Sequence, residues 1–117
     1  MRKDNIRDYA TAAFREYARL GSPSSVEHLE RDNAALAADL RAVKETLRIL
    51  DAEGNRYIAD AVRAVYFAAP SSPLLKGEIS ARVAAFAKEY PTCERCVYRW
   101  LKRARGLFAR LRGLRIK

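Results

Sequence analysis

The chain ends in a strongly basic stretch, TCERCVYRWLKRARGLFARLRGLRIK, which runs from Thr92 to Lys117. From Arg95 onward this stretch holds nine Lys and Arg residues and no acidic residue. At about 100° per residue, one side of a helix would collect apolar side chains: Val97, Leu101, Ala104, Phe108 and Leu111. The opposite side would collect cations: Arg95, Arg99, Lys102, Arg103 and Arg110. The pattern predicts an amphipathic helix over about 93–112 that docks by its apolar side and offers its charged side to an anion.

A second amphipathic segment comes directly before the basic one. Its apolar residues recur at helical spacing: Ile79, Val83, Phe86 and Tyr90. We expect a helix over about 76–90 that ends at Pro91, because proline lacks an N–H group and disfavours a helical residue before it. The Thr92 hydroxyl is suited to cap the next helix. A helix, a short turn and a basic helix form the layout of a helix-turn-helix, whose second helix enters the major groove of DNA.

The run CERCVYRWLKRA, residues 93–104, resembles the recognition helix of region-4-like domains of bacterial sigma factors. In that family the run is typically Ser-x-x-Thr-Val-x-x-x-Leu-x-x-Ala, and its Val, Leu and Ala are buried. The matching residues are Val97, Leu101 and Ala104, while Cys93 and Cys96 stand where Ser and Thr are usual. The resemblance covers about residues 79–111. It implies a transcriptional regulator of the kind found in temperate phages and related mobile elements, with RNA polymerase open as a partner, but not a complete sigma factor.

The first half of the chain carries a heptad pattern. Ser24 with Glu27 forms a capping-box signature, so we expect a long helix to start there. Apolar residues then alternate at spacings of three and four, with one polar member: Val26, Leu29, Asn33, Leu36, Leu40, Val43, Leu47 and Leu50. A buried Asn33 in such a seam would specify register and partner number. Two interpretations stay open, which are packing within the chain and a homodimer. The homodimer would use Leu29, Asn33, Leu36, Leu40, Val43 and Leu47.

Together these patterns predict an all-α protein: a long heptad-patterned helix plus a C-terminal trihelical helix-turn-helix core. We expect an N-terminal helical hairpin over 1–53, which is the dimerisation region in the homodimer interpretation, and a DNA-binding domain over 54–117. Gly54 is expected to end the long helix in a left-handed conformation. Residues 1–69 have no net charge, so the whole net charge of +9 belongs to residues 70–117. With no apolar run long enough to span a bilayer and no secretory-type start, we expect a cytoplasmic protein without a membrane partner.

The exposed side of the basic helix predicts which residues would contact double-stranded DNA. Arg95, Arg99 and Lys102 lie in its N-terminal half, which reaches base edges, and Arg suits bidentate contact with guanine. The expected phosphate contacts are Thr92, Tyr98, Arg103, Arg105, Arg110 and Arg112, which would set affinity rather than sequence preference. The alternative is a helical adaptor whose basic helix binds an acidic protein partner or RNA.

Cys93 and Cys96 form the one C-x-x-C motif of the chain. The only histidine is His28 and there is no second cysteine pair, so we expect no metal site. A helix start lowers the pKa of a thiol, which leaves redox activity open beside the simpler interpretation of two small residues at a helix start. No phosphate-binding loop or nucleophile motif is present, so we expect neither an enzyme nor a cofactor.

Overall fold

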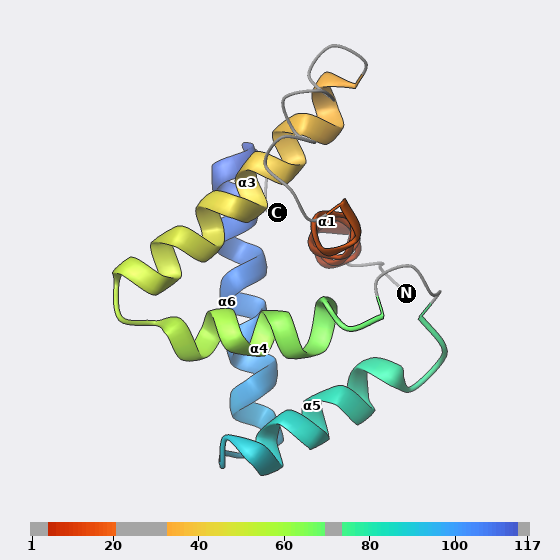
Figure 1. The fold of residues 1–117 in the computed structure, drawn as a ribbon, viewed down its shortest axis with the longest axis vertical. Helices are drawn as coiled ribbons and strands as arrows, with labels where there is room; N and C mark the ends of the chain where they lie inside the picture. The colour runs from red at the N-terminus through yellow and green to blue at the C-terminus, as the bar shows by residue number, and fades with distance from the viewer. Residues whose placement is uncertain (1–4, 21–32, 70–73, 115–117) are drawn as a thin grey trace.

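The computed structural model describes residues 5–20, 33–69 and 74–114, and every regular element within these ranges is helical. The helices are α1 (Asn5–Leu20), α3 (Ala34–Ala52), α4 (Arg56–Tyr66), α5 (Glu78–Glu89) and α6 (Glu94–Arg112). The predicted all-α class is therefore confirmed. Helix α6 packs against each of the other four described helices, and Figure 1 shows it running behind α3, α4 and α5. The basic helix is thus the central helix of the fold.

The sequence of α6 explains why this helix can occupy the centre. Its buried residues form one stripe at helical spacing: Val97, Leu101, Ala104, Phe108 and Ala109. Leu111 was wrongly predicted to belong to this stripe, because it is exposed in the last turn of the helix. The helix ends where Gly113 adopts a left-handed conformation with φ of 78°. The Gly113 N–H then donates to the Arg110 carbonyl, and the Leu114 N–H donates to the Ala109 carbonyl at 2.8 Å. This Schellman arrangement satisfies carbonyls that the helix itself leaves without partners.

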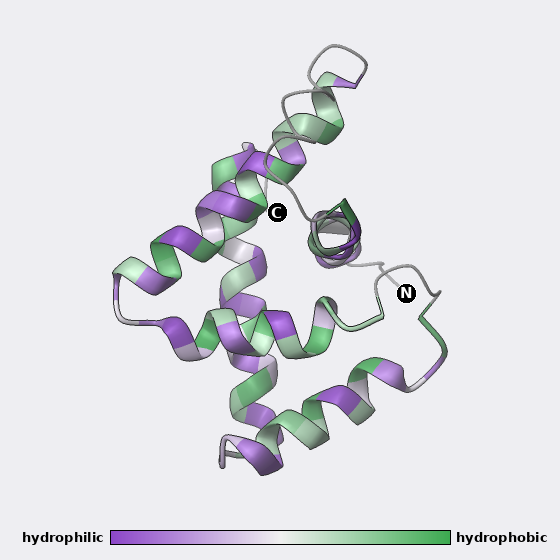
Figure 2. Ribbon diagram, viewed as in Figure 1, coloured by the Kyte–Doolittle hydropathy of each residue, from purple (hydrophilic) through white to green (hydrophobic). Residues whose placement is uncertain are grey.

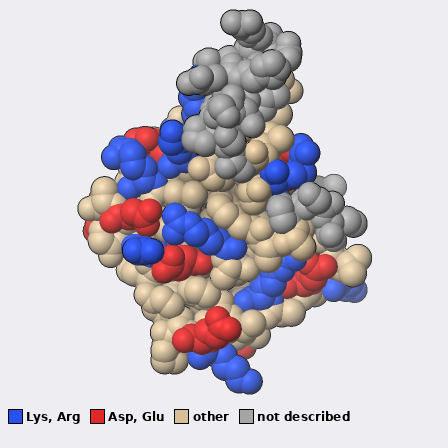
Figure 3. Space-filling model, in the orientation of Figure 1, with Lys and Arg blue, Asp and Glu red and all other residues tan. Residues whose placement is uncertain are grey.

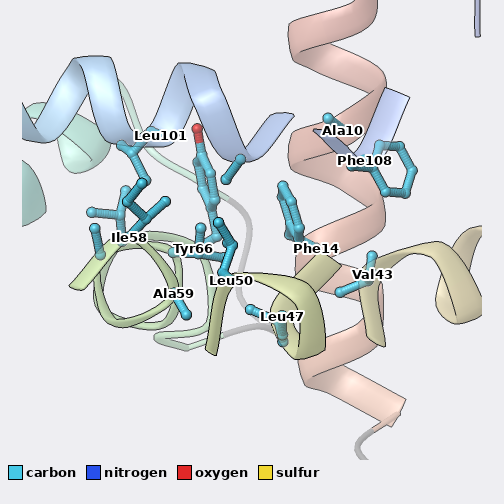
Figure 4. Packing of buried hydrophobic residues seen from close by; sticks show 14 of the residues in the cluster. Ala10, Phe14, Val43, Leu47, Leu50, Ile58, Ala59, Tyr66, Leu101 and Phe108 are labelled. Carbon is cyan, nitrogen blue, oxygen red and sulfur yellow. The ribbon is translucent and has the colours of Figure 1, made fainter. Parts of the chain in front are cut away.

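One main buried cluster joins all five described helices. Phe14 of α1 stacks on Tyr66 of α4 with ring centroids 5.6 Å apart. The Phe14 ring also lies 5.6 Å from the ring of Phe108 of α6, in a tilted arrangement. Figure 4 shows Leu50 of α3 between Tyr66 and Phe14, and Phe108 beside Ala10 of α1. Hydrophobic and hydrophilic residues alternate along the helices in Figure 2, as expected for elements that bury one side. The cluster draws residues from both sides of the predicted domain boundary after residue 53.

The predicted role of Asn33 was wrong. Asn33 is exposed and lies outside the helix, with φ of −151° and ψ of 87°. Its side-chain oxygen accepts a hydrogen bond of 3.0 Å from the Leu36 N–H, which makes it the N-cap of α3. Asparagine competes for the free amides of a helix start more readily than it occupies an apolar seam. One helix therefore does not continue from Ser24 to Leu50, and Leu29 lies outside the described residues.

The apolar seam of α3 is buried within a single chain. Leu40, Val43 and Leu47 are 1 %, 0 % and 7 % exposed. Leu40 packs with Leu36 of α3 and with α1, and the other two belong to the main cluster. Packing within the chain accounts for this spacing, and a homodimer through the same residues would require α3 to separate from α1 and α6.

The predicted helices at 76–90 and 93–112 are present as α5 and α6, joined by a short turn at 90–93. The Thr92 N–H donates to the Ala87 carbonyl at 2.7 Å, which folds the turn back onto α5. Helices α4, α5 and α6 pack against one another in all three pairs.

Within the ranges described, no helix combines the length and the hydropathy needed to cross a lipid bilayer.

Candidate nucleic-acid interface

The side of α6 opposite its buried stripe carries a row of exposed cations: Arg95, Arg99, Lys102, Arg103 and Arg110. Within the described part of the chain, none of these side chains forms an ion pair with a carboxylate. The surface over α3, α4 and α5 differs, because cations there alternate with acids, as Figure 3 shows. Arg48 with Glu45 and Arg63 with Asp51 are examples of its ion pairs. The positive charge of this row is therefore not neutralised by the described carboxylates.

The three predicted base contacts lie together on this exposed face. Arg95, Arg99 and Lys102 are all exposed and occupy positions i, i+4 and i+7 of the first half of α6. At the helical rise per residue they extend over roughly 10 Å. That length is close to the width of the major groove of B-form DNA, about 12 Å. The arrangement could present two guanidinium groups and one ammonium group to one segment of a groove.

An aromatic cluster holds this half of α6 against the body. Trp100 lies at the margin of the apolar side and meets Tyr57 of α4 edge-on, with ring centroids 4.8 Å apart. It also contacts Tyr90, at the end of α5, at 5.6 Å. On the opposite flank Tyr98 is exposed and its hydroxyl donates to the Ser80 hydroxyl at 3.2 Å. These contacts connect α6 to α4 and α5 and fix the direction in which the exposed cations point.

The predicted phosphate contacts separate into two groups. Arg103, Arg110 and Tyr98 are exposed, and Thr92 is half-buried in the turn. Arg105 instead turns inward, where its Nη1 donates to the Tyr66 hydroxyl at 2.8 Å. It borders an apolar pocket of about 570 Å³ between α1, α4, α5 and α6. We therefore remove Arg105 from the candidate interface.

Arg112 is also engaged within the molecule. Its Nε donates to Asp39 Oδ1 of α3 at 2.6 Å, and the two side chains are only 25 % and 15 % exposed. The Tyr9 hydroxyl of α1 donates to the same oxygen at 2.7 Å. This hydrogen bond to Asp39 is the main reason that the pKa of Tyr9 is raised, and Asp39 likewise raises the pKa of Arg112. Arg112 thus joins α6 to α1 and α3, and we remove it from the candidate interface as well.

The N-cap of α6 is Cys93, and the prediction that Thr92 would take this role was wrong. The Cys93 backbone is extended, with φ of −95° and ψ of 154°, and its Sγ accepts a hydrogen bond from the Cys96 N–H at 3.3 Å. The two sulfur atoms lie 2.7 Å apart. Hydrogen bonds from Cys93 first and Thr92 second, with the Arg99 charge as a smaller cause, lower the pKa of Cys96. No group of three or more His, Cys, Asp or Glu side chains that could hold a metal ion occurs among the described residues.

Comparison of the chain with protein-family models, with curated proteins and with solved structures finds no match. The geometry and charge of the α6 surface therefore carry the functional assignment.

Proposed function

We propose that this chain binds double-stranded DNA in a sequence-specific manner, with α5 and α6 as its helix-turn-helix, and that it regulates transcription. The observation that carries the proposal is the row of exposed cations on α6 that lacks acidic partners among the described residues. A polyanion would supply the missing counter-charges. Duplex DNA is such a polyanion, because it carries one negative charge per about 1.7 Å of its axis.

The way α6 is packed favours DNA binding over the alternative that its cations are only solvated and bind no ligand. Its first half projects the cations at 95, 99 and 102, while Val97, Leu101 and Ala104 on the other side are at most 1 % exposed. Those three are the residues that the sigma region-4 resemblance requires to be buried. Cys93 caps the helix from the position where that family has serine. The packing of α4 on both α5 and α6 is the support for a trihelical core.

The proposed role of each exposed residue follows from its position along α6. Arg95 and Arg99, in the first half, read base edges, because an N-terminal half enters the groove in helix-turn-helix complexes. Lys102 extends this line. Arg103 and Arg110 bind phosphates, with Tyr98 at the flank and Thr92 in the turn as further phosphate contacts. RNA polymerase is the further partner suggested by the resemblance, in a cytoplasmic regulator of a phage or host operon.

The test begins with selection of bound duplexes from a random DNA pool, which gives the preferred site. Binding to that site and to single-base variants is then measured for three substitutions. Arg99→Ala should relax preference at one base pair, at a cost of about 1–3 kcal/mol there. Arg110→Ala should weaken all sequences alike. Arg48→Ala is the matched control, because Arg48 is an exposed arginine that pairs with Glu45 on α3, and it should change neither quantity.

Two outcomes would contradict the proposal. Equal losses on every sequence for Arg99→Ala and Arg110→Ala would exclude direct base readout by Arg99. Selection of no duplex, together with a protein partner that stays bound after nuclease treatment or with preferential binding of single-stranded RNA, would favour the adaptor alternative.

A further inference from the structure

The proposed DNA contacts leave the cysteine pair at the start of α6 without a role. Cys93 is exposed and Cys96 is half-buried, so solvent reaches this end of the helix. Cys93 also lines a surface groove with Ala84 and Lys88 of α5. Neither thiol is enclosed in the core, where a cysteine would be inert.

The capping geometry is what brings the two sulfur atoms together. An N-cap residue has an extended backbone, and its side chain turns back over the first turn toward the amide three residues later. Here that side chain is a thiol, and the residue three positions later is also a cysteine. The Cys93 Sγ therefore lies 3.3 Å from the Cys96 nitrogen and 2.7 Å from the Cys96 Sγ. No backbone movement is needed to bring the two thiols into contact.

The surroundings favour a thiolate at this place. Hydrogen bonds to Cys96 and the nearby Arg99 charge lower the pKa of its thiol. The positive end of the helix dipole acts in the same direction. Thiolates, rather than thiols, are the nucleophiles in exchange with disulfides.

We propose that Cys93 and Cys96 are a thiol–disulfide exchange site that closes to an internal disulfide on reaction with a low-molecular-weight disulfide. The Cys96 thiolate attacks one sulfur of the small disulfide, forms a mixed disulfide and releases one small thiolate. Cys93 then loses its proton and attacks the Cys96 sulfur, which releases the second small thiolate. The protein loses two electrons and two protons, and the small disulfide is reduced to two thiols.

Formation of the internal disulfide would change the first turn of α6. The effect that this change has on DNA binding rests on the proposed function. A disulfide sulfur is a weaker acceptor than a thiolate or thiol, so the Cys96 N–H loses part of its cap. The turn that it caps carries Arg95 and leads to Arg99. We expect oxidation to weaken sequence-specific DNA binding by roughly fivefold, the size that loss of one helix cap would give.

The exchange site is tested by mass. The full chain is equilibrated with mixtures of reduced and oxidised glutathione, free thiols are alkylated, and the intact mass is measured. We expect the wild type to lose two hydrogen atoms, to carry no glutathione, and to recover both thiols with dithiothreitol. Cys93→Ser keeps a hydroxyl for the cap but lacks the second thiol, so it should stop at a glutathione adduct on Cys96. Cys96→Ser should stop at an adduct on Cys93.

Accumulation of glutathione adducts or disulfide-linked dimers on the wild type, or two free thiols at the most oxidising ratio, would overturn the exchange site. DNA binding is measured separately on the reduced and oxidised chain. A reduced chain that binds no DNA contradicts the proposed function, while the mass result still decides the exchange site. Equal binding in both states overturns the regulatory consequence alone.

Discussion

The exposed side of α6 and its flank use the same residue type in opposite ways. On the exposed side, Arg95 in the first half and Arg110 in the second form no ion pair with a described carboxylate. On the flank, Arg105 donates to Tyr66 of α4 and Arg112 donates to Asp39 of α3. An arginine on this helix therefore offers surface charge or joins helices according to its neighbours, and its position on the helical wheel decides which.

The largest difference between the two sides of α6 should appear in stability. Phe108 is fully buried and contacts Phe14 and Tyr9. Phe108→Ala should lower the free energy of unfolding by about 3–5 kcal/mol, because it leaves a cavity at the centre of the fold. Arg103→Ala, on the exposed side of the same helix, should stay within about 0.5 kcal/mol. Urea unfolding of both variants measures the contrast, and similar losses would show that α6 is not organised around its buried stripe.

The next largest effect should come from Asp39, which receives both Arg112 and Tyr9. Asp39→Asn should cost about 1–2 kcal/mol, since charge-assisted hydrogen bonds are lost from a site that is only partly exposed. Glu45→Gln is the control, because Glu45 pairs with Arg48 on the open surface, and it should leave thermal unfolding unchanged. If the two substitutions behave alike, the Asp39 network adds nothing to the fold.

The same network predicts a pH dependence. The hydrogen bond to Asp39 raises the folded-state pKa of Tyr9 above the ordinary phenol value. Its contribution to stability is therefore complete below an unfolded pKa of about 10 and is lost as the pH rises through the folded pKa. Unfolding followed between neutral and alkaline pH should show this loss in the wild type and a smaller one in Tyr9→Phe. An identical alkaline profile for Tyr9→Phe would contradict the assignment.

A comparison of Arg110 with Arg112 sharpens the contrast between exposed and engaged cations. Arg110→Ala should leave stability unchanged and reduce the salt dependence of DNA binding by about one unit of slope. Arg112→Ala should do the reverse, with lower stability and an unchanged slope, because its charge is already satisfied by Asp39. Plots of log binding constant against log salt concentration measure this directly. Equal slopes for the two variants would place Arg112 back in the interface.

The smallest effect concerns Gly106, which lies among the exposed cations of α6. A Cβ atom at this position would lie more than 4 Å from its neighbours among the described residues, outside the helix's own backbone. Gly106→Ala should therefore raise the free energy of unfolding by about 0.5–1 kcal/mol, because alanine loses less backbone freedom in a helix. A lower melting temperature for this variant would contradict the prediction, because it would mean that the added methyl group disturbs the packing around α6.

The sequence predicted those parts of the fold that depend on local periodicity. Four of the five residues predicted for the buried stripe of α6, the helix break at Pro91 and the left-handed Gly54, with φ of 79°, follow from residue spacing and backbone chemistry alone. The exception is Leu111, which lies in the last turn of α6 and is exposed. The position of Arg105 and Arg112 could not be predicted, because their partners lie 39 and 73 residues away along the chain. Both arginines fall at the flank of the helical wheel, where a long side chain can turn either way.

The two capping errors have a common origin. The residues concerned are Asn33, which the repeating pattern places in the apolar seam, and Cys93, because residue preference favours its neighbour Thr92 as the cap. Each actually caps a helix with its side chain, through hydrogen bonds from Leu36 and Cys96. Capping is a competition among neighbouring polar residues for the same free amides, and small differences in backbone angles decide it. Periodicity alone does not contain that information.

The central place of α6 also has a consequence for how the protein would survive in a cell. The helix that would bind a nucleic acid is also the one that packs against all the other described helices. A partner that binds only the folded chain lowers the population of open forms that proteases attack. Nucleic acid bound to α6 would therefore lengthen the lifetime of the whole protein. A shorter fragment that contains α6 would lack the helices that pack against it, and it would lose its fold with them.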